Sequence, residues 1–292
     1  MSVAVAVACA PPGRAAIVAP SSPPSPPPTD PTATLVGAGD IAACNTDNDE
    51  ATAKLIDHIK GEVFTLGDNA YEDGSPTDFT RCYVPTWGRH RSRTHPAVGN
   101  HDYGTAGAAG YFAYFGAAAG ARGQGWYGYD AGTWHVVVLN SNCSIVDCAA
   151  GSPQERWLRE DLARSQARCT LAYWHHPLFS SGLHGGEPAL RPMWQALVDG
   201  RADVVLSGHD HDYERFAPQD ADGRGSPEGV REFVVGTGGR SLYPVSARAP
   251  NSEAVLADVY GVLQLTLAPN AYAWSFIATD ERVLDQGQGA CH

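Results

Sequence analysis

One pattern recurs along this chain and restricts how it can fold. Five times an apolar stretch that reads as a buried strand runs into a short turn, and each turn carries a side chain that can bind a metal ion. Glycine precedes four of the five groups, which lets the backbone turn sharply and approach the site closely. The turns read GAGDIA with Asp40, LGDNAY with Asp68 and Tyr71, VGNHD with Asn100 and His101, WHHP with His175 and His176, and GHDH with His209 and His211.

The order of strands and turns predicts that these side chains meet. In open α/β sheets, ligand sites collect at the carboxyl ends of strands, so turns far apart in sequence can surround one site. A single Asp or Asn after glycine is usually only a turn residue. Five such turns in one chain, including the pairs Asn100–His101 and His209–His211, favour a metal site over unrelated turns.

The side-chain types indicate which metals such a site would bind. Carboxylate, imidazole, amide oxygen and phenolate together suit iron, zinc or manganese rather than a thiolate site. Seven candidate ligands are too many for one ion and suit two ions that share a bridging carboxylate. Two ions about 3.5–4 Å apart can bind the attacking and leaving oxygens of a phosphoryl group and generate hydroxide near neutral pH.

The remaining periodicity predicts an α/β pattern that gives way to β. Ser152 is the predicted N-cap of one helix, with Pro153 in its first turn and Glu155 three residues after the cap. Residues 104–125, rich in glycine and alanine, are interpreted as a surface excursion around a short helix at 111–115. The aromatic residues of YFAYF and of the following GWYGYD are expected in the core rather than in a substrate platform. Strands are expected within 32–40, 62–69, 133–142, 169–177, 202–211, 231–239, 260–267 and 271–278, and helices within 51–60, 152–166 and 187–200.

Charge and hydropathy exclude some classes of partner. The net charge is −12, and an acidic surface argues against nucleic acid, whose phosphates select stripes of lysine and arginine. No stretch beyond the amino terminus is long and apolar enough to span a bilayer. An anionic substrate would therefore need local attraction from a metal or an arginine cluster.

The cysteines predict an oxidising compartment. Cys9 lies near the amino terminus, no C-x-x-C pair occurs, and the other six cysteines can form three disulfides. The sequence alone does not fix their connectivity, and free buried thiols are the alternative. The pairing we predict is Cys44–Cys82, Cys143–Cys148 and Cys169–Cys291.

The first 31 residues are expected to lie outside the folded domain. Residues 1–20 resemble the end of an export signal without its basic region, with Ala8-Cys9-Ala10 as a candidate cleavage site. The proline- and serine-rich stretch 19–31 is typical of a disordered linker. We therefore expect one domain, 32–292, in a secreted or cell-envelope protein of undetermined oligomeric state.

The motif series GD…GDNAY…GNHD…HHP…GHDHDYER resembles the calcineurin-like metallophosphoesterases, and among them the purple acid phosphatases. The ending FVVGTGGR…SEAVLADVYGVLQLTL resembles bacterial secreted members of that group. The resemblance implies an α/β (α+β) fold, a four-layer αββα sandwich of two mixed β-sheets flanked by helices. It also implies a dinuclear metal site at one sheet edge.

The resemblance also assigns roles to individual residues. Asp40, Tyr71 and His211 would bind the first metal, Asp68 would bridge, and Asn100, His175 and His209 would bind the second. His101 would stabilise or protonate the leaving oxygen, and His184, in SSGLHGGE, would contact the substrate. His176 is the rival of His175, but the ligand lies two residues before the proline in the family motif. His209 and His211 are expected on the same side of an extended segment.

Residues around these motifs are expected to play supporting roles. Ligating imidazoles need partners on their other nitrogen, so the neighbouring acids are interpreted as supporting or turn-forming. These residues are Asp102, Asp210, Asp212, Glu214 and Arg215. Histidines without motif context are interpreted as surface or structural residues: His58, His90, His95, His135 and His292.

Two departures from the family pattern affect the predicted metals and substrate. Ala42 stands where many relatives have glycine or histidine and cannot bind a metal, so Tyr71 would complete the first site and favour Fe³⁺. The second ion would be Zn²⁺, Fe²⁺ or Mn²⁺. Gly185 stands where purple acid phosphatases often carry a second histidine, which bears on the pH optimum and the preference for monoesters.

The predicted function is a metal-dependent hydrolase of small phosphoric esters that uses metal-bound hydroxide, with monoesters preferred. The alternatives are a phosphodiesterase acting on nucleotides or phospholipid head groups, and a catalytically silent scaffold.

Overall fold

The computed structural model describes residues 1–2 and 31–292. The predicted export signal, Cys9 and all but the last residue of the proline-rich stretch lie outside the described residues. Among those described, no helix is long and apolar enough to cross a membrane.

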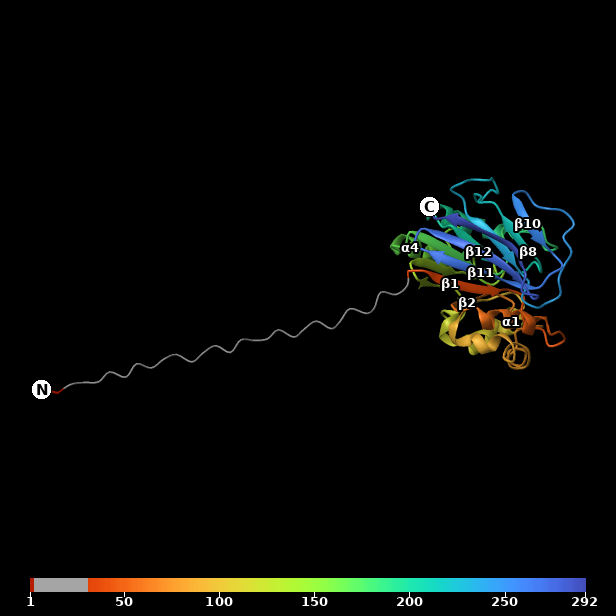
Figure 1. The fold of residues 1–292 in the computed structure, drawn as a ribbon, viewed down its shortest axis with the longest axis horizontal. Coiled ribbons are helices and arrows are strands. Elements are labelled where there is room, and N and C mark those ends of the chain that lie inside the picture. Colours follow the sequence, from red (N-terminus) through yellow and green to blue (C-terminus); the bar gives the residue numbers. More distant parts are fainter. Residues whose placement is uncertain (3–30) are drawn as a thin grey trace.

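Two mixed β-sheets form the centre of the fold (Figure 1). The first has the order β13-β12-β11-β1-β2-β3, with parallel pairs between β1, β2 and β3 and antiparallel pairs elsewhere. Its strands are β1 (Ala33–Ala38), β2 (Glu62–Leu66), β3 (Thr94–Ala97), β11 (Gly261–Ala268), β12 (Ala271–Ala278) and β13 (Val283–Ala290).

The second sheet has the order β10-β8-β9-β7-β6-β5-β4. Its strands β5, β6, β7 and β9 are parallel, and β4, β8 and β10 pair antiparallel to their neighbours. The strands are β4 (Tyr127–Ala131), β5 (Trp134–Val138), β6 (Cys169–Tyr173), β7 (Val204–Ser207), β8 (Tyr213–Phe216), β9 (Arg231–Val235) and β10 (Ser252–Leu256).

Helices cover the outer faces of the sheets. α4 (Pro153–Arg164) and α5 (Arg191–Asp199) pack on the second sheet, where Val137 lies in their apolar cluster while its neighbours Val136 and Val138 face the core between the sheets. α1 (Asn48–His58) packs against β11 of the first sheet. The predicted four-layer αββα arrangement is thereby confirmed.

Short helical segments connect these elements. They are α2 (Pro76–Asp78), α3 (Ala109–Phe115), a π-helical turn at Phe79–Tyr83, and 3₁₀ turns at Trp87–Arg93, Asp102–Gly104, Ala106–Ala108, Gly116–Ala119 and Pro188–Leu190. Figure 1 shows α1 and the segment from α2 to α3 gathered on one side of the β1–β2 region, in orange and yellow.

Local sequence signals fix several of these elements. The Ser152 hydroxyl accepts the Glu155 N–H at 3.2 Å, so the predicted start of α4 is confirmed. All three predicted disulfides are present as well. The two residues Cys169 and Cys291 tie the start of β6 to the end of the last strand, and so join the two sheets.

The aromatic part of residues 104–125 lies in the core, as expected, so the surface excursion is limited to the residues around it. Tyr111, Phe112 and Phe115 of α3 are buried in the main apolar cluster, and the Tyr111 hydroxyl donates to the Pro96 carbonyl at 2.9 Å.

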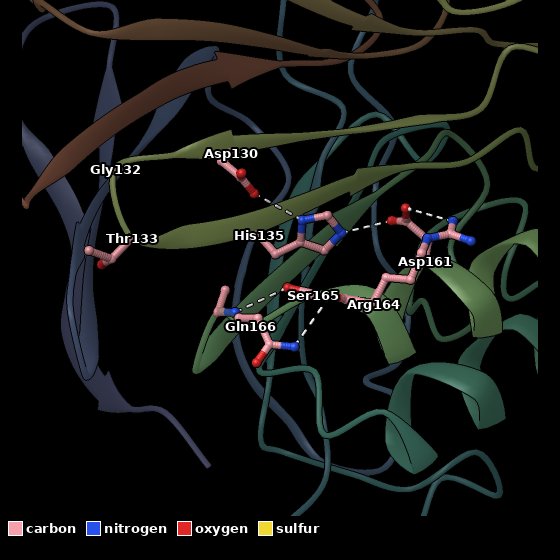
Figure 2. Close-up of a pocket in the computed structure, with 9 residues that line it drawn as sticks. Asp130, Gly132, Thr133, His135, Asp161, Arg164, Ser165 and Gln166 are labelled. Atoms are coloured by element: carbon pink, nitrogen blue, oxygen red, sulfur yellow. Dashed lines mark hydrogen bonds and ion pairs between the residues drawn. The ribbon is translucent and has the colours of Figure 1, made fainter.

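His135 has the structural role that we expected (Figure 2). Its Nδ1 lies 3.1 Å from an oxygen of Asp130 in β4, and its Nε2 lies 2.7 Å from an oxygen of Asp161 in α4. The two carboxylates sit on opposite nitrogens of the ring and therefore do not converge on a common point. The arrangement links β4, β5 and α4 beside a hollow of about 500 Å³.

Candidate metal centre

The predicted ligands come from the carboxyl ends of parallel strands in both sheets. Asp40 follows β1, Asp68 follows β2, Asn100 follows β3, His175 follows β6, and His209 follows β7. Because the two sheets are packed together, these five strand ends lie side by side, and their polar side chains meet. This brings together residues spread over more than half of the sequence.

Unusual backbone conformations in these turns direct the polar side chains toward one another. Asp40, Asp68 and His209 have φ values of 59°, 50° and 69°, in the left-handed region that non-glycine residues rarely occupy. Gly67 is required for a different reason, since a Cβ there would lie 2.6 Å from Nδ1 of His175. Residues cluster in such strained conformations at functional sites when the surrounding structure holds them there.

The predicted ligands of the first metal form one group of donor atoms. The Tyr71 hydroxyl lies 3.0 Å from Oδ1 of Asp40, 3.2 Å from Oδ2 of Asp68 and 3.4 Å from Nε2 of His211. Nε2 of His211 lies 3.3 Å from Oδ1 of Asp40. All four side chains are buried.

The predicted ligands of the second metal form an adjoining group. Nε2 of His175 lies 2.9 Å from Oδ1 of Asn100, 3.2 Å from Nδ1 of His209 and 3.3 Å from Oδ2 of Asp68. Oδ2 of Asp68 is therefore the atom that the two groups share. Its other oxygen accepts the His101 N–H at 2.8 Å, which fixes the carboxylate between the two groups.

The spacing of these atoms fits two cations. Metal–ligand bonds of about 2.0–2.2 Å place neighbouring ligand atoms about 3 Å apart around one ion. The donors within each group lie at such separations, and a shared carboxylate oxygen is what a two-ion site requires. The residues present therefore fit the dinuclear group that the sequence predicts.

The hydrogen bonds of the ring nitrogens set the orientation of the imidazoles. Nδ1 of His175 donates to the Leu66 carbonyl at 2.7 Å, and Nδ1 of His211 donates to the Ser241 carbonyl. In each ring the proton on Nδ1 leaves Nε2 with a lone pair that faces the donor group. Backbone carbonyls, and not the neighbouring acids, are therefore the partners of these two imidazoles, which leaves the acids the turn-forming role that was the other expectation.

The acids instead hold the loops that surround the site. Asp102 accepts the Gly99 N–H at 2.9 Å before Asn100. Asp210 accepts the N–H groups of His184 at 2.8 Å and Gly185 at 3.2 Å, so it fixes the loop that carries His184.

Glu214 accepts the Ser181 N–H at 2.7 Å, in the same loop. Asp212 is buried, and neither of its side-chain oxygens has a hydrogen-bond partner among the described residues.

The electrostatics of the site favour bound positive charge. Burial, reinforced by Asp40 and Asp68, raises the pKa of Tyr71 well above its usual value. For Asp68, burial acts to raise the pKa, but the charge of His175 outweighs it and holds the pKa well below the usual range. Burial would lower the pKa of His175, yet Asp68 raises it to about 9. A cation that replaced this proton would balance the same buried carboxylates.

His101 and His184 lie on the open side of the donor groups. The His101 ring lies 4.5 Å from the Tyr71 ring, with Nε2 4.0 Å from Oδ2 of Asp68 and Nδ1 donating to the Glu72 carbonyl at 2.6 Å. The exposed His184 ring lies 4.6 Å from the His209 ring. Both histidines therefore border the donor groups, His101 beside Tyr71 and Asp68, and His184 beside His209.

The prediction of an extended segment for His209 and His211 is wrong. Residues 209–212 form a series of bends, and β8 begins only at Tyr213. The left-handed conformation of His209 turns its ring toward His175, while the ring of His211 turns toward Asp40. The two histidines therefore reach different groups through a turn and not through strand alternation.

Residues that no sequence motif marks also border the site. Arg240 lies 4.7 Å from the Tyr71 ring centre and pairs with Glu72 at 2.8 Å. The Tyr243 ring stacks on His211 with centroids 4.2 Å apart. Both lie in the loop after β9, where the only sequence signal was a glycine-rich stretch.

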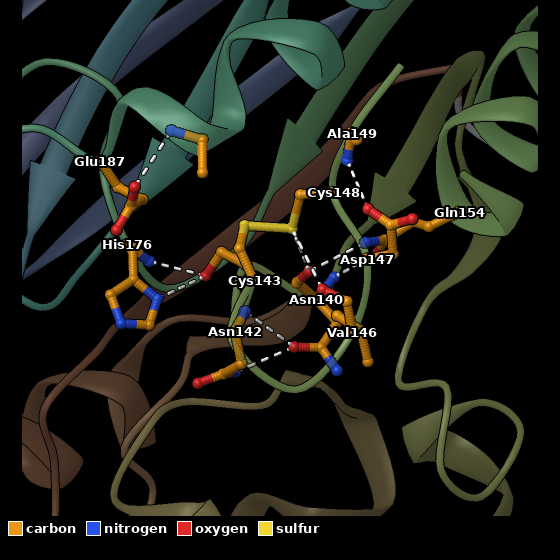
Figure 3. The surroundings of a disulfide bond; sticks show 12 residues. Asn140, Asn142, Cys143, Val146, Asp147, Cys148, Ala149, Gln154, His176 and Glu187 are labelled. Atoms are coloured by element: carbon orange, nitrogen blue, oxygen red, sulfur yellow. Dashed lines mark hydrogen bonds between the residues drawn. A yellow bond between two sulfur atoms is a disulfide. The ribbon is translucent and has the colours of Figure 1, made fainter. Parts of the chain in front are cut away.

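Ser141 is a further residue that no sequence motif marks. It is buried, and its hydroxyl contacts the backbone and ring of His176. Figure 3 shows His176 beside the loop closed by Cys143–Cys148.

Comparison with known proteins places this architecture in context. The model of a family described as "Calcineurin-like phosphoesterase" matches residues 33–213. Purple acid phosphatase 22 of Arabidopsis thaliana is 33% identical over 134 residues, which cover 44% of this chain and 30% of that protein. Purple acid phosphatase 1 of Ipomoea batatas is 29% identical over 200 residues, covering 61% of this chain and 41% of that protein.

A solved structure is similar over most of the chain. The structure of purple acid phosphatase PPD1 from yellow lupin (Lupinus luteus) seeds has a TM-score of 0.73 at 19% identity and covers 88% of this chain and 53% of that one. This likeness concerns the fold. The matched stretch spans less than half the length of either sequence relative.

Proposed function

The chain belongs to the calcineurin-like phosphoesterase family, and from that premise we propose that it is a metal-dependent hydrolase of phosphoric esters with phosphomonoesters as preferred substrates. The observation that carries the proposal is the position of Oδ2 of Asp68, within 3.3 Å of donor atoms from both groups. The catalytic domain would comprise residues 32–292. The three disulfides support an extracytoplasmic location.

Each donor group would hold one cation. Asp40, Tyr71 and His211 would hold the first, and Asn100, His175 and His209 the second, with Asp68 between them. Two bound cations would supply positive charge for the phosphoryl oxygens and a water molecule of lowered pKa as the nucleophile. Tyr71 as a phenolate ligand favours Fe³⁺ at the first position, with Zn²⁺, Fe²⁺ or Mn²⁺ at the second.

The two histidines that border the donor groups would act on the ester itself. His101, fixed through Nδ1 by the Glu72 carbonyl, would present Nε2 to the leaving oxygen and stabilise or protonate it. His184 would contact the phosphoryl group from the opposite side, on a loop fixed by Asp210. The net charge of −12 makes such local attraction necessary for an anionic substrate.

Two chromogenic esters test the proposed activity. We expect the purified protein to hydrolyse p-nitrophenyl phosphate with a higher kcat/KM than bis(p-nitrophenyl) phosphate, and to lose both activities after dialysis against a chelator. Adding back iron and zinc should restore hydrolysis. A higher kcat/KM for the bis ester would replace the monoesterase by the phosphodiesterase alternative, and full activity in metal-free protein would refute the metal-dependent mechanism.

The Tyr71→Phe variant tests the ferric assignment. A phenolate bound to Fe³⁺ gives a visible absorption band, so the wild-type protein loaded with iron should be coloured and the variant should lose the band. Tyr243→Phe is the matched control, because this ring stacks on His211 outside both donor groups and should leave the band in place. Colour that survives in Tyr71→Phe would remove Tyr71 from the metal.

A further inference from the structure

His176 has hydrogen bonds that determine which of its ring nitrogens carries a proton. The Ser141 hydroxyl, which is 1% exposed, accepts the backbone N–H of His176 at 2.8 Å and that of His175 at 3.2 Å. The same oxygen lies 2.9 Å from Nδ1 of His176. These three contacts meet at one atom.

A hydroxyl can accept two hydrogen bonds and donate one. The two backbone N–H groups occupy both acceptor positions of Ser141, so its own proton must point to Nδ1 of His176. Nδ1 is then an acceptor, and the proton of the neutral ring is on Nε2. His176 therefore presents an N–H group on its free nitrogen, without a lone pair with which Nε2 could bind a metal.

The ring that carries this N–H group lies beside the second donor group. The His176 ring is 4.3 Å from the His209 ring and 4.9 Å from the His175 ring, and it is half-buried. Figure 3 shows the second nitrogen of the His176 ring on the side away from the Cys143–Cys148 disulfide. Since the His184 ring lies 4.6 Å from the same His209 ring, His209 is in contact with both.

We propose that His176 is a substrate-binding residue whose Nε2–H donates a hydrogen bond to a phosphoryl oxygen of the ester. The inference rests on the proposed function, since it places the phosphoryl group at the second donor group. It excludes the competing reading in which His175, His176 and His209, whose ring nitrogens lie within 4.8 Å of one another, all bind one ion. Ser141 is then a positioning residue, because its hydrogen bond to Nδ1 keeps the ring proton of His176 on Nε2.

Binding of inorganic phosphate and metal content test this proposal in the full-length, metal-loaded protein. We expect His176→Ala to raise the Kd for phosphate in calorimetric titration about tenfold, as for the loss of one hydrogen bond to a charged group. Metal content by elemental analysis should equal that of the wild type. His176→Gln, which keeps an N–H donor, should recover part of the affinity, and His58→Ala on the exposed end of α1 should change nothing.

Three results would overturn the inference. They are a phosphate Kd unchanged in His176→Ala, a loss of about half of the bound metal in that variant, and a ¹⁵N spectrum that places the ring proton of His176 on Nδ1. If the wild type bound phosphate with the expected dependence on His176 but hydrolysed no ester, the proposed function would fail and the phosphate contact would stand. The two His176 variants should first show the cooperative thermal unfolding of a folded domain.

Discussion

The Asp68→Asn variant is expected to lose most of its activity together with bound metal, while keeping its fold. Asparagine matches aspartate in shape and still offers an acceptor to the His101 N–H, but it removes the negative oxygen that both donor groups share. The loss of charge stabilisation from a cation is worth several kcal/mol. At 1.36 kcal/mol per tenfold, kcat/KM should fall about 1,000-fold or more.

His101→Ala is the matched comparison for this prediction. Its side chain borders the donor groups and lies outside both, so kcat should fall about 100-fold without loss of metal. Elemental analysis and ester hydrolysis of the two variants separate the roles. An Asp68→Asn protein with two bound metals and near-normal kcat would contradict the shared carboxylate, and unchanged activity in His101→Ala would remove that histidine from catalysis.

Of the three disulfides, Cys169–Cys291 should cause the largest loss of folding stability when it is removed. The bond closes a loop with a sequence separation of 122 and joins the first residue of β6 to the end of the chain after β13. A closed loop of about 100 residues restricts the unfolded chain by about 4.7 kcal/mol, and losses of about 2–5 kcal/mol are typical. The double variant Cys169→Ser/Cys291→Ser should therefore melt about 10 °C lower, as calorimetry can measure.

The disulfide Cys143–Cys148 provides the control for that experiment. Its sequence separation is only 5, so the same relation gives about 2 kcal/mol. Its removal should lower the melting temperature less, yet it should loosen the loop beside Ser141. Equal losses of stability for the two double variants would show that loop length does not govern the effect.

The sequence contained enough to predict the donor set because that information is local. Asp40, Asp68, Asn100 and His209 each follow a glycine at the end of an apolar run, and such runs become strands whose carboxyl ends can meet. The helix start at Ser152 was equally readable, because capping depends on residues three apart. The two-sheet sandwich came from the resemblance of the whole motif series to a family, and the family match and the solved structure bear it out.

The contacts that support the site could not be predicted from the sequence, because they involve backbone groups, which every residue possesses. The carbonyls of Leu66 and Ser241 orient two imidazoles, and no side chain marks either residue for that task. The left-handed turn at His209 depends on an N–H bond to Asp40, a residue 169 positions away in the chain. An extended segment was the reasonable local expectation, and only the hydrogen bond from this turn to Asp40 at the end of β1 changed it.

The sequence by itself therefore determined which metal-binding types of side chain stand at the strand ends and in which order they occur along the chain. The tertiary structure alone decided which atom of each side chain faces the centre, and it brought Arg240, Tyr243 and Ser141 to the site. The physical reason is that residue type follows from covalent chemistry. Orientation depends on hydrogen bonds and packing between segments that meet only when the two sheets come together.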